Sequence, residues 1–235
     1  MRLLTKKISY LSGEINVPGF FCLPENQTSC PAVLIFHGSD GFKPNHEAIA
    51  RKLAKEGLAA LALNWFGGES ERSHWDTIQA EDILQAVSFL KQQPAVDSDR
   101  LGLIGFSRGG GLALIMGSMI RQTKAIVNYF GLTSWRRGME EFRHLSLSPT
   151  NHLNFVSQIE CPILSFHGDM DTVVPVEDTL YLDAICRRFG VDHQHIIYPG
   201  VNHSFIWPGD KHDIMAHRDS WDKTLKFLKQ NLKRH

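Results

Sequence analysis

Three polar side chains that lie far apart in the sequence could together activate an alcohol: Ser107, Asp171 and His203. Ser107 is the centre of a Gly-x-Ser-x-Gly pattern whose glycines are Gly105 and Gly109. A serine hydroxyl becomes a nucleophile when an imidazole takes its proton and a carboxylate orients that imidazole. Ser, Asp, His is one of the chain orders in which such triads occur. The sequence therefore predicts acyl-transfer chemistry at a serine.

The residues around Ser107 predict a sharp turn from a strand into a helix. The apolar run Leu101–Gly105 is typical of a buried strand, and Leu112–Arg121 is typical of a helix that packs against it. Flanking glycines allow the tight turn, and the first amides of a helix lack intrahelical partners. The alternative is an ordinary glycine-rich turn in which Ser107 only caps the helix.

The candidate acid follows a second predicted strand, Pro162–Phe166. A polar turn after this strand contains Asp169 and Asp171, and a helix is expected over Pro175–Phe189. We prefer Asp171 to Asp169 as the orienting carboxylate. The alternative role of Asp171 is to cap the helix that begins at Pro175.

The candidate base, His203, follows a third predicted strand, Gln194–Tyr198. The chain has 12 histidines, so a single histidine in a loop would more often be a surface residue. The argument for His203 is joint: a serine, an aspartate and a histidine each follow a strand, in the required order.

Stabilisation of a developing oxyanion needs two backbone donors. The strand Ala32–Phe36 ends in the loop His37-Gly38-Ser39-Asp40-Gly41. We assign the donors to the amides of Ser39 and Arg108. His37 and Gly38 could also serve only to close the strand, and the Arg108 side chain could contact substrate or form a structural ion pair.

The remaining pattern predicts an α/β protein. Strands are expected at 6–11, 15–23, 58–63 and 125–129, and helices at 45–56, 76–93 and 214–232. The first two strands would pair around the turn at Ser12-Gly13. Strands that alternate with helices favour a mostly parallel central sheet with helices on both faces, and ligands bind beyond the carboxyl ends of its strands. Each candidate catalytic residue falls at such an end.

Several residues are weaker candidates for substrate contact. The segment 131–159 is long for a connection and is expected to form a partial lid, in which Arg136 or Arg137 could hold an acidic group. Each arginine could equally belong to a solvated amphipathic helix. Trp65 and Phe66 could line the acyl pocket or be plain core aromatics.

Length and composition predict one domain over residues 1–235. The chain has 25 basic and 25 acidic side chains, so the totals favour neither nucleic acid nor a membrane surface as a partner. An N-terminus without an apolar stretch after its charges predicts a soluble, cytoplasmic protein. The four cysteines lack metal-binding spacing and are expected to be free thiols. We expect no cofactor and no metal for the reaction, and the oligomeric state stays open.

From the His37-Gly38 loop to the last helix, the chain resembles the dienelactone hydrolase family of the α/β-hydrolase superfamily. The resemblance rests on the Gly-x-Ser-x-Gly turn, the pattern Gly-x-x-Asp-x-x-Val-Pro around Asp171 and the pattern Gly-x-x-His that ends at His203. It implies an α/β-hydrolase fold and maps the catalytic triad onto Ser107, Asp171 and His203. Family members proper use a cysteine nucleophile and a glutamate in the oxyanion loop, whereas this chain has Ser107 and Gly38.

Two further stretches, 58–67 and 216–225, are similar to the C-terminal domain of bile acid-CoA:amino acid N-acyltransferases and acyl-CoA thioesterases. Those relatives carry an additional N-terminal β-domain, which this sequence lacks. Three hypotheses follow: a small-molecule carboxylic ester hydrolase, which we favour, an acyl-CoA thioesterase or acyltransferase, and a non-catalytic ligand receptor.

Overall fold

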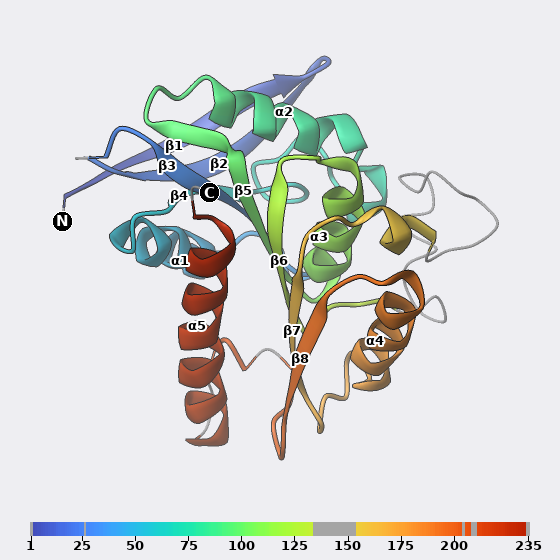
Figure 1. Ribbon diagram of the computed structural model, residues 1–235. Helices are drawn as coiled ribbons and strands as arrows, with labels where there is room; N and C mark the ends of the chain where they lie inside the picture. Colours follow the sequence, from blue (N-terminus) through green and yellow to red (C-terminus); the bar gives the residue numbers. More distant parts are fainter. Residues whose placement is uncertain (1, 26, 134–153, 204, 208–210, 234–235) are drawn as a thin grey trace.

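Eight strands form one sheet in the computed structural model, which describes residues 2–25, 27–133, 154–203, 205–207 and 211–233 (Figure 1). The strands are β1 (Leu3–Ser12), β2 (Ile15–Pro24), β3 (Cys30–Phe36), β4 (Ala59–Leu63), β5 (Val96–Phe106), β6 (Thr123–Tyr129), β7 (Ile163–Gly168) and β8 (His193–Tyr198). Their order across the sheet is β1-β2-β4-β3-β5-β6-β7-β8. β2 is antiparallel to both β1 and β4. The strands β3 to β8 all run parallel to one another.

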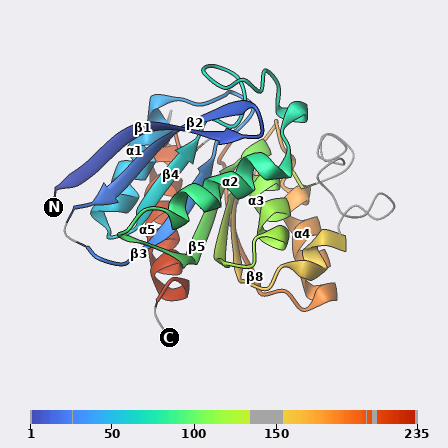
Figure 2. The same ribbon diagram turned by 90° about the horizontal axis from the view of Figure 1, so that it is seen from above.

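Helices cover both faces of this sheet, as Figures 1 and 2 show. One face carries α1 (Pro44–Lys55) and α5 (Lys211–Asn231), and the other carries α2 (Ala80–Lys91), α3 (Arg108–Met119) and α4 (Glu177–Phe189). The predicted fold class, a mostly parallel α/β-hydrolase sheet between two helical layers, is confirmed.

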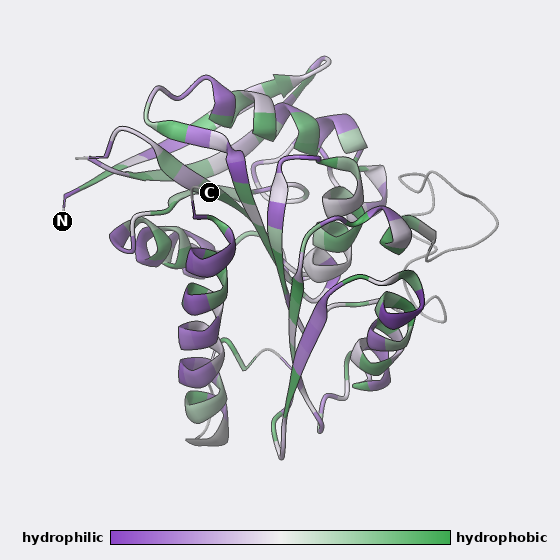
Figure 3. Cartoon of the chain, viewed as in Figure 1, coloured by the Kyte–Doolittle hydropathy of each residue, from purple (hydrophilic) through white to green (hydrophobic). Residues whose placement is uncertain are grey.

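The alternation of side chains along the central strands produces two hydrophobic cores. In β3, Val33 and Ile35 point to the face covered by α1 and α5, whereas Leu34 and Phe36 point to the other face. All four are almost completely buried. A continuous apolar strand is expected where helices cover both faces of a sheet. By contrast, α5 is hydrophilic along much of its length because one side of it meets solvent (Figure 3).

The helix predicted over residues 76–93 is divided in two. A 3₁₀ turn spans Trp75–Thr77, and α2 begins only at Ala80. Asp82 explains the break, because its carboxylate accepts a hydrogen bond from the Gln79 amide at 2.8 Å and is held by Arg72 at 2.8 and 3.1 Å. These contacts give the amide at the start of α2 a hydrogen-bond partner and keep the preceding residues extended.

The four cysteines are free thiols, as predicted, and all of them are buried: Cys22, Cys30, Cys161 and Cys186. Within the described part of the chain, every helix is too short or too polar to cross a bilayer.

Candidate active site

The loops that carry the candidate residues lie at one edge of the sheet, the one formed by the carboxyl ends of its parallel strands. Ser107 follows β5, Asp171 follows β7 and His203 follows β8, and all three strands are parallel. The loop from His37 to Gly41 follows β3, which is also parallel to β5. Parallel strands end on the same side of a sheet, so residues that are distant in sequence share this edge.

Ser107 sits in a strained turn between β5 and α3. Its φ of 51° and ψ of −117° lie in a region that L-residues rarely adopt. A Cβ at Gly105 would lie 2.1 Å from the carbonyl oxygen of Gly109. A Cβ at Gly109 would lie 2.4 Å from the carbonyl oxygens of Phe36 and His37. Both glycines of the pattern are therefore required by close backbone approach.

Neighbouring backbone holds this turn on two sides. The Ser107 amide donates to the carbonyl of Tyr129 at 2.9 Å, and the Leu132 amide donates to the carbonyl of Ser107 at 3.1 Å. The loop after β3 lies on another side, because a Cβ at Gly38 would be 3.3 Å from the Ser107 Cβ. These contacts fix the strained conformation, and Ser107 itself remains half-buried.

The structure brings Asp171 and His203 together. Nδ1 of His203 lies 2.6 Å from Oδ2 of Asp171. The other oxygen, Oδ1, accepts hydrogen bonds from the amides of Val173 and Val174, each at 2.8 Å. Asp171 therefore organises the turn before α4, as its capping alternative supposed, and also binds the imidazole.

Asp169 plays a different part. Its Oδ1 accepts a hydrogen bond from the Gly200 amide at 2.7 Å, which ties the loop after β7 to the loop after β8. Asn202 supports the same tie, because its Oδ1 accepts from the amides of His203 at 2.8 Å and Thr172 at 3.4 Å. The preference for Asp171 over Asp169 agrees with this geometry.

His167, in β7, is a residue that the sequence analysis did not single out. Its side chain is completely buried, and Nε2 lies 3.2 Å from Oδ2 of Asp171 and 2.9 Å from the carbonyl oxygen of Val174. Nδ1 lies 2.8 Å from Oγ1 of Thr179. The one signal in the sequence is an ionisable residue inside an otherwise buried strand.

These contacts determine the charge of the carboxylate. Burial alone would raise the pKa of Asp171, but hydrogen bonds from His167 and His203, the charge of His203 and the Val174 amide together hold that pKa well below its ordinary value. Asp171 is therefore an anion over the whole physiological pH range.

Phe130 is a second residue that the sequence did not reveal. It follows β6 with a φ of 39°, which is unfavourable for a bulky side chain. Its amide donates to the carbonyl of Phe166 at 2.6 Å. The ring meets the His203 imidazole at an edge, with centroids 4.6 Å apart and planes at 62°. Phe130 thus limits where the imidazole can lie.

The two residues assigned to the oxyanion hole are in contact. Nε of Arg108 donates to Oγ of Ser39 at 2.9 Å, and the guanidinium lies 3.9 Å from the ring centroid of Trp75. Burial lowers the pKa of Arg108, and Asp76 opposes this effect. The Arg108 side chain thus joins the loop after β3 to the loop before α2, while its amide is the first of α3.

The other predicted contact residues are less accessible. Trp65 is fully buried and donates from Nε1 to the carbonyl of His37 at 3.2 Å, and Phe66 is 7% exposed. In this conformation Trp65 is a core aromatic behind the loop, and a substrate contact stays a prediction. Arg136 and Arg137, with most of the predicted lid, lie outside the described residues.

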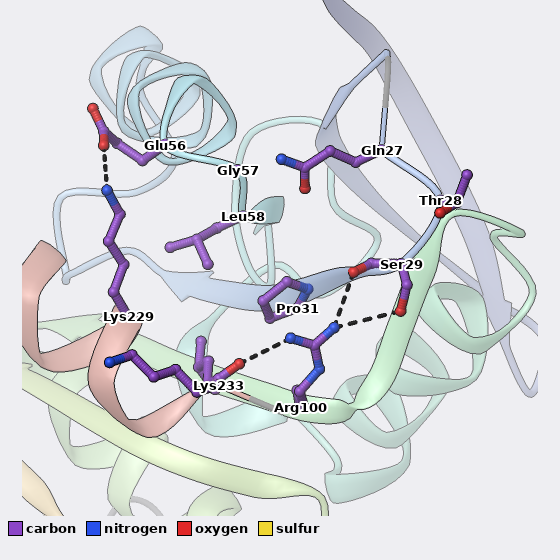
Figure 4. A pocket seen from close by; sticks show the side chains of 11 residues that line it. Gln27, Thr28, Ser29, Pro31, Glu56, Gly57, Leu58, Arg100, Lys229 and Lys233 are labelled. Atoms are coloured by element: carbon purple, nitrogen blue, oxygen red, sulfur yellow. Dashed lines mark hydrogen bonds and ion pairs between the residues drawn. The ribbon is translucent and has the colours of Figure 1, made fainter. Parts of the chain in front are cut away.

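A cavity of about 700 Å³ lies at the opposite edge of the sheet (Figure 4). It is lined by residues that include Ser29 and Pro31, near the start of β3, and Lys229 of α5. Arg100 points into it but is already held by the carbonyls of Ser29 at 2.9 Å and Leu232 at 3.0 Å. This cavity is separate from the edge that carries Ser107.

The eight-stranded, mostly parallel sheet between two helical layers is an α/β-hydrolase fold. The profile of the dienelactone hydrolase family matches residues 17–232. The chain belongs to the dienelactone hydrolase family, and it is a hydrolase that acts on ester bonds.

Several relatives extend along nearly the whole chain. It is 28% identical to a probable 2-oxo-3-(5-oxofuran-2-ylidene)propanoate lactonase of Bradyrhizobium sp., over 86% of this chain and 84% of that protein. It is 22% identical to a "Putative carboxymethylenebutenolidase" of Synechocystis sp., over 97% and 98%. The crystal structure of a dienelactone hydrolase-like promiscuous phosphotriesterase from metagenomic libraries has a TM-score of 0.78 at 24% identity, and covers 97% of this chain and 98% of that one.

Proposed function

We propose that this hydrolase cleaves small-molecule carboxylic esters through a triad of Ser107, His203 and Asp171. The main support is the 2.6 Å contact between Asp171 and His203 at the sheet edge that also carries the strained Ser107 turn. The lactonase and carboxymethylenebutenolidase names of its relatives agree with a small ester or lactone as substrate.

In the first half-reaction, His203 accepts the Ser107 proton as Oγ attacks the carbonyl carbon of the ester. A bond forms between Oγ and that carbon, and the carbonyl oxygen becomes negative. When the tetrahedral intermediate collapses, the bond to the leaving alcohol breaks and His203 returns the proton to the departing oxygen. The product of this step is an acyl-enzyme on Ser107.

In the second half-reaction, His203 takes a proton from water, and the hydroxide oxygen attacks the acyl carbon. The bond to Ser107 Oγ then breaks, Ser107 regains the proton, and a carboxylic acid leaves. Through both steps Asp171 holds the Nδ1–H tautomer of His203 and stabilises the imidazolium. The reaction needs no electron carrier or Lewis acid to balance.

The amides of Ser39 and Arg108 are proposed to bind the oxyanion. The Arg108 amide begins α3, where backbone donors have no intrahelical partner. The close approach of Gly38 to the Ser107 Cβ, 3.3 Å for a built Cβ, supports a loop that faces the nucleophile. Such donors act on charge that develops only in the transition state.

The experiment that tests this function measures hydrolysis of p-nitrophenyl acetate and butyrate beside a panel of acyl-CoA thioesters. Wild-type protein is compared with Ser107→Ala, and labelling by a fluorophosphonate is followed by mass spectrometry. We expect ester turnover and a covalent adduct at Ser107, and neither in the variant.

Other outcomes distinguish the alternatives. Faster turnover of acyl-CoA than of esters would favour a thioesterase or acyltransferase. If no substrate gives turnover that depends on Ser107, and the fluorophosphonate does not label the protein, the proposal fails and a ligand receptor becomes the better hypothesis.

A further inference from the structure

A second group of histidine and carboxylate side chains lies on α4 and β8, away from the Ser107 edge. His193 and His195 are two apart on β8 and therefore point to the same face of the sheet. That face is covered by α4, which carries Asp183. β8 is hydrophilic where it begins, unlike its neighbour β7 (Figure 3). His193 is the first residue of its strand, so the group lies toward the edge opposite His203.

Three ligand atoms converge in this group. Nδ1 of His193 lies 3.2 Å from Oδ1 of Asp183, and Nδ1 of His195 lies 3.4 Å from the same oxygen. One ligand atom from each of the three residues lies within 4.8 Å of one ligand atom from each of the others. Zinc binds imidazole nitrogen and carboxylate oxygen at about 2.0–2.2 Å, so two ligands of a tetrahedral zinc ion are about 3.3–3.5 Å apart. The spacing from Oδ1 to His195 lies in this range, and the spacing to His193, which is a hydrogen bond in this structure, is about 0.1 Å shorter.

Two of the atoms that face away from this group, on His193 and Asp183, already have hydrogen-bond partners. Nε2 of His193 lies 2.8 Å from Oγ of Ser165, and the second oxygen of Asp183 accepts from Nε of Arg187 at 2.8 Å. Metal-binding imidazoles and carboxylates usually have partners of this kind, which fix the ring orientation. With Ser165 as a partner, Nε2 can carry the proton, and a cation would then replace the hydrogen bond that Nδ1 makes with Asp183.

Access and charge also suit a cation. The side chain of His195 is 25% exposed, so water can reach the open side of the group, whereas that of His193 is 1% exposed. Burial is the largest effect on His193 and lowers its pKa, so the imidazole is neutral and can act as a ligand, while the nearby carboxylates of Asp183 and Asp192 attract positive charge. Arg187 opposes this effect, but its side chain is 77% exposed and therefore well solvated.

We propose that Asp183, His193 and His195 form a zinc site that joins α4 to β8, the outermost strand of the sheet, with water as the fourth ligand. The proposed site is independent of the ester chemistry at Ser107. It stabilises the folded chain, because an ion that binds only the native state raises stability with its concentration.

The reference protein in the test has no polyhistidine tag and differs from the natural chain only by His203→Ala; it is stripped with chelator and titrated with Zn²⁺ by calorimetry. Binding is also followed by the visible absorption of Co²⁺, which is strong when coordination is tetrahedral. All proteins carry His203→Ala, so that the triad histidine cannot supply the signal. We expect one Zn²⁺ per chain with a Kd of about 10 μM or tighter, and a higher melting temperature with Zn²⁺.

Two variants of proposed ligands and one control variant test whether Zn²⁺ binds at this site. His195→Gln and Asp183→Asn are each expected to weaken Zn²⁺ binding at least tenfold and to abolish the thermal shift. The control is His74→Ala, which removes an exposed histidine paired with Asp76 at 2.7 Å. Equal Zn²⁺ affinity in His195→Gln, Asp183→Asn and the control, or no binding below 100 μM in a folded protein, would overturn the proposal.

Discussion

Nε2 of His167 lies 3.2 Å from Oδ2 of Asp171, the same carboxylate oxygen that binds His203. The carboxylate is thus held between two imidazoles, one fully buried and one 13% exposed. Because His167 is fixed by Thr179 on its other nitrogen, it is a positioning residue for Asp171. Its effect on catalysis must pass through the carboxylate.

Replacement of His167 by leucine is expected to lower kcat roughly 10- to 100-fold with little change in KM. A hydrogen bond to a charged group contributes about 1.5–3 kcal/mol, and this one supports the orientation of Asp171. His167→Gln can still donate from a nitrogen near the same point and should recover part of the activity. Steady-state kinetics on both variants checks this, and equal losses in Gln and Leu would argue for a role in packing only.

The oxyanion assignment predicts losses of very different size for two substitutions at Ser39. Ser39→Ala keeps the backbone amide and removes only the hydroxyl that accepts from Arg108, so kcat should fall less than tenfold. Ser39→Pro removes the amide itself, and kcat should fall about a hundredfold or more. Ser39 is exposed, so near-ultraviolet circular dichroism should show both variants folded. Similar kcat values in the two variants would exclude the Ser39 amide as a donor.

Buried histidines predict an unusual sensitivity to mild acid. Burial lowers the pKa of His37 to about 3 and those of His46 and His193 to about 4, against an ordinary value of 6.5. These groups contribute stability above pH 6.5, and that stability is lost as the pH falls toward the folded-state values, because the unfolded chain binds the protons first. With three such groups, the free energy of unfolding changes by up to roughly 4 kcal/mol per pH unit.

Urea unfolding between pH 7 and pH 4, in the presence of chelator, measures this slope. In His46→Gln, the unfolded chain should bind one proton fewer in excess of the folded chain, so the pH dependence of the unfolding free energy should fall by about a third. A slope that is the same in wild type and variant would show that His46 does not contribute.

Backbone strain predicts that Ser107→Gly is more stable than wild type. Glycine adopts the observed φ of 51° and ψ of −117° without a Cβ penalty, so the melting transition should correspond to a gain on the order of 1 kcal/mol. The same variant lacks the proposed nucleophile and should show no fluorophosphonate labelling. Ser107→Ala, which keeps the Cβ, is the matched control and should not be stabilised.

The sequence allowed the sheet edge and the pairing of Asp171 with His203 to be predicted, because both depend on where strands end. Hydrophobic runs and turn residues carry that information locally. The contacts of Phe130 could not be predicted, since they join segments that meet only in the folded chain, and those of His167 depend on how the turn after β7 folds back onto the strand. The break before α2 was missed for the same reason: Arg72 and Asp82 meet only after the preceding loop has folded.

The unfavourable torsion at Ser107 has a consequence for laboratory evolution of this enzyme. Because Ser107 is the proposed nucleophile, a library screened for heat resistance alone is expected to enrich replacements at this position that relax the turn and abolish the proposed activity. Catalysis must therefore be selected together with thermostability, since at this one residue the two requirements oppose each other.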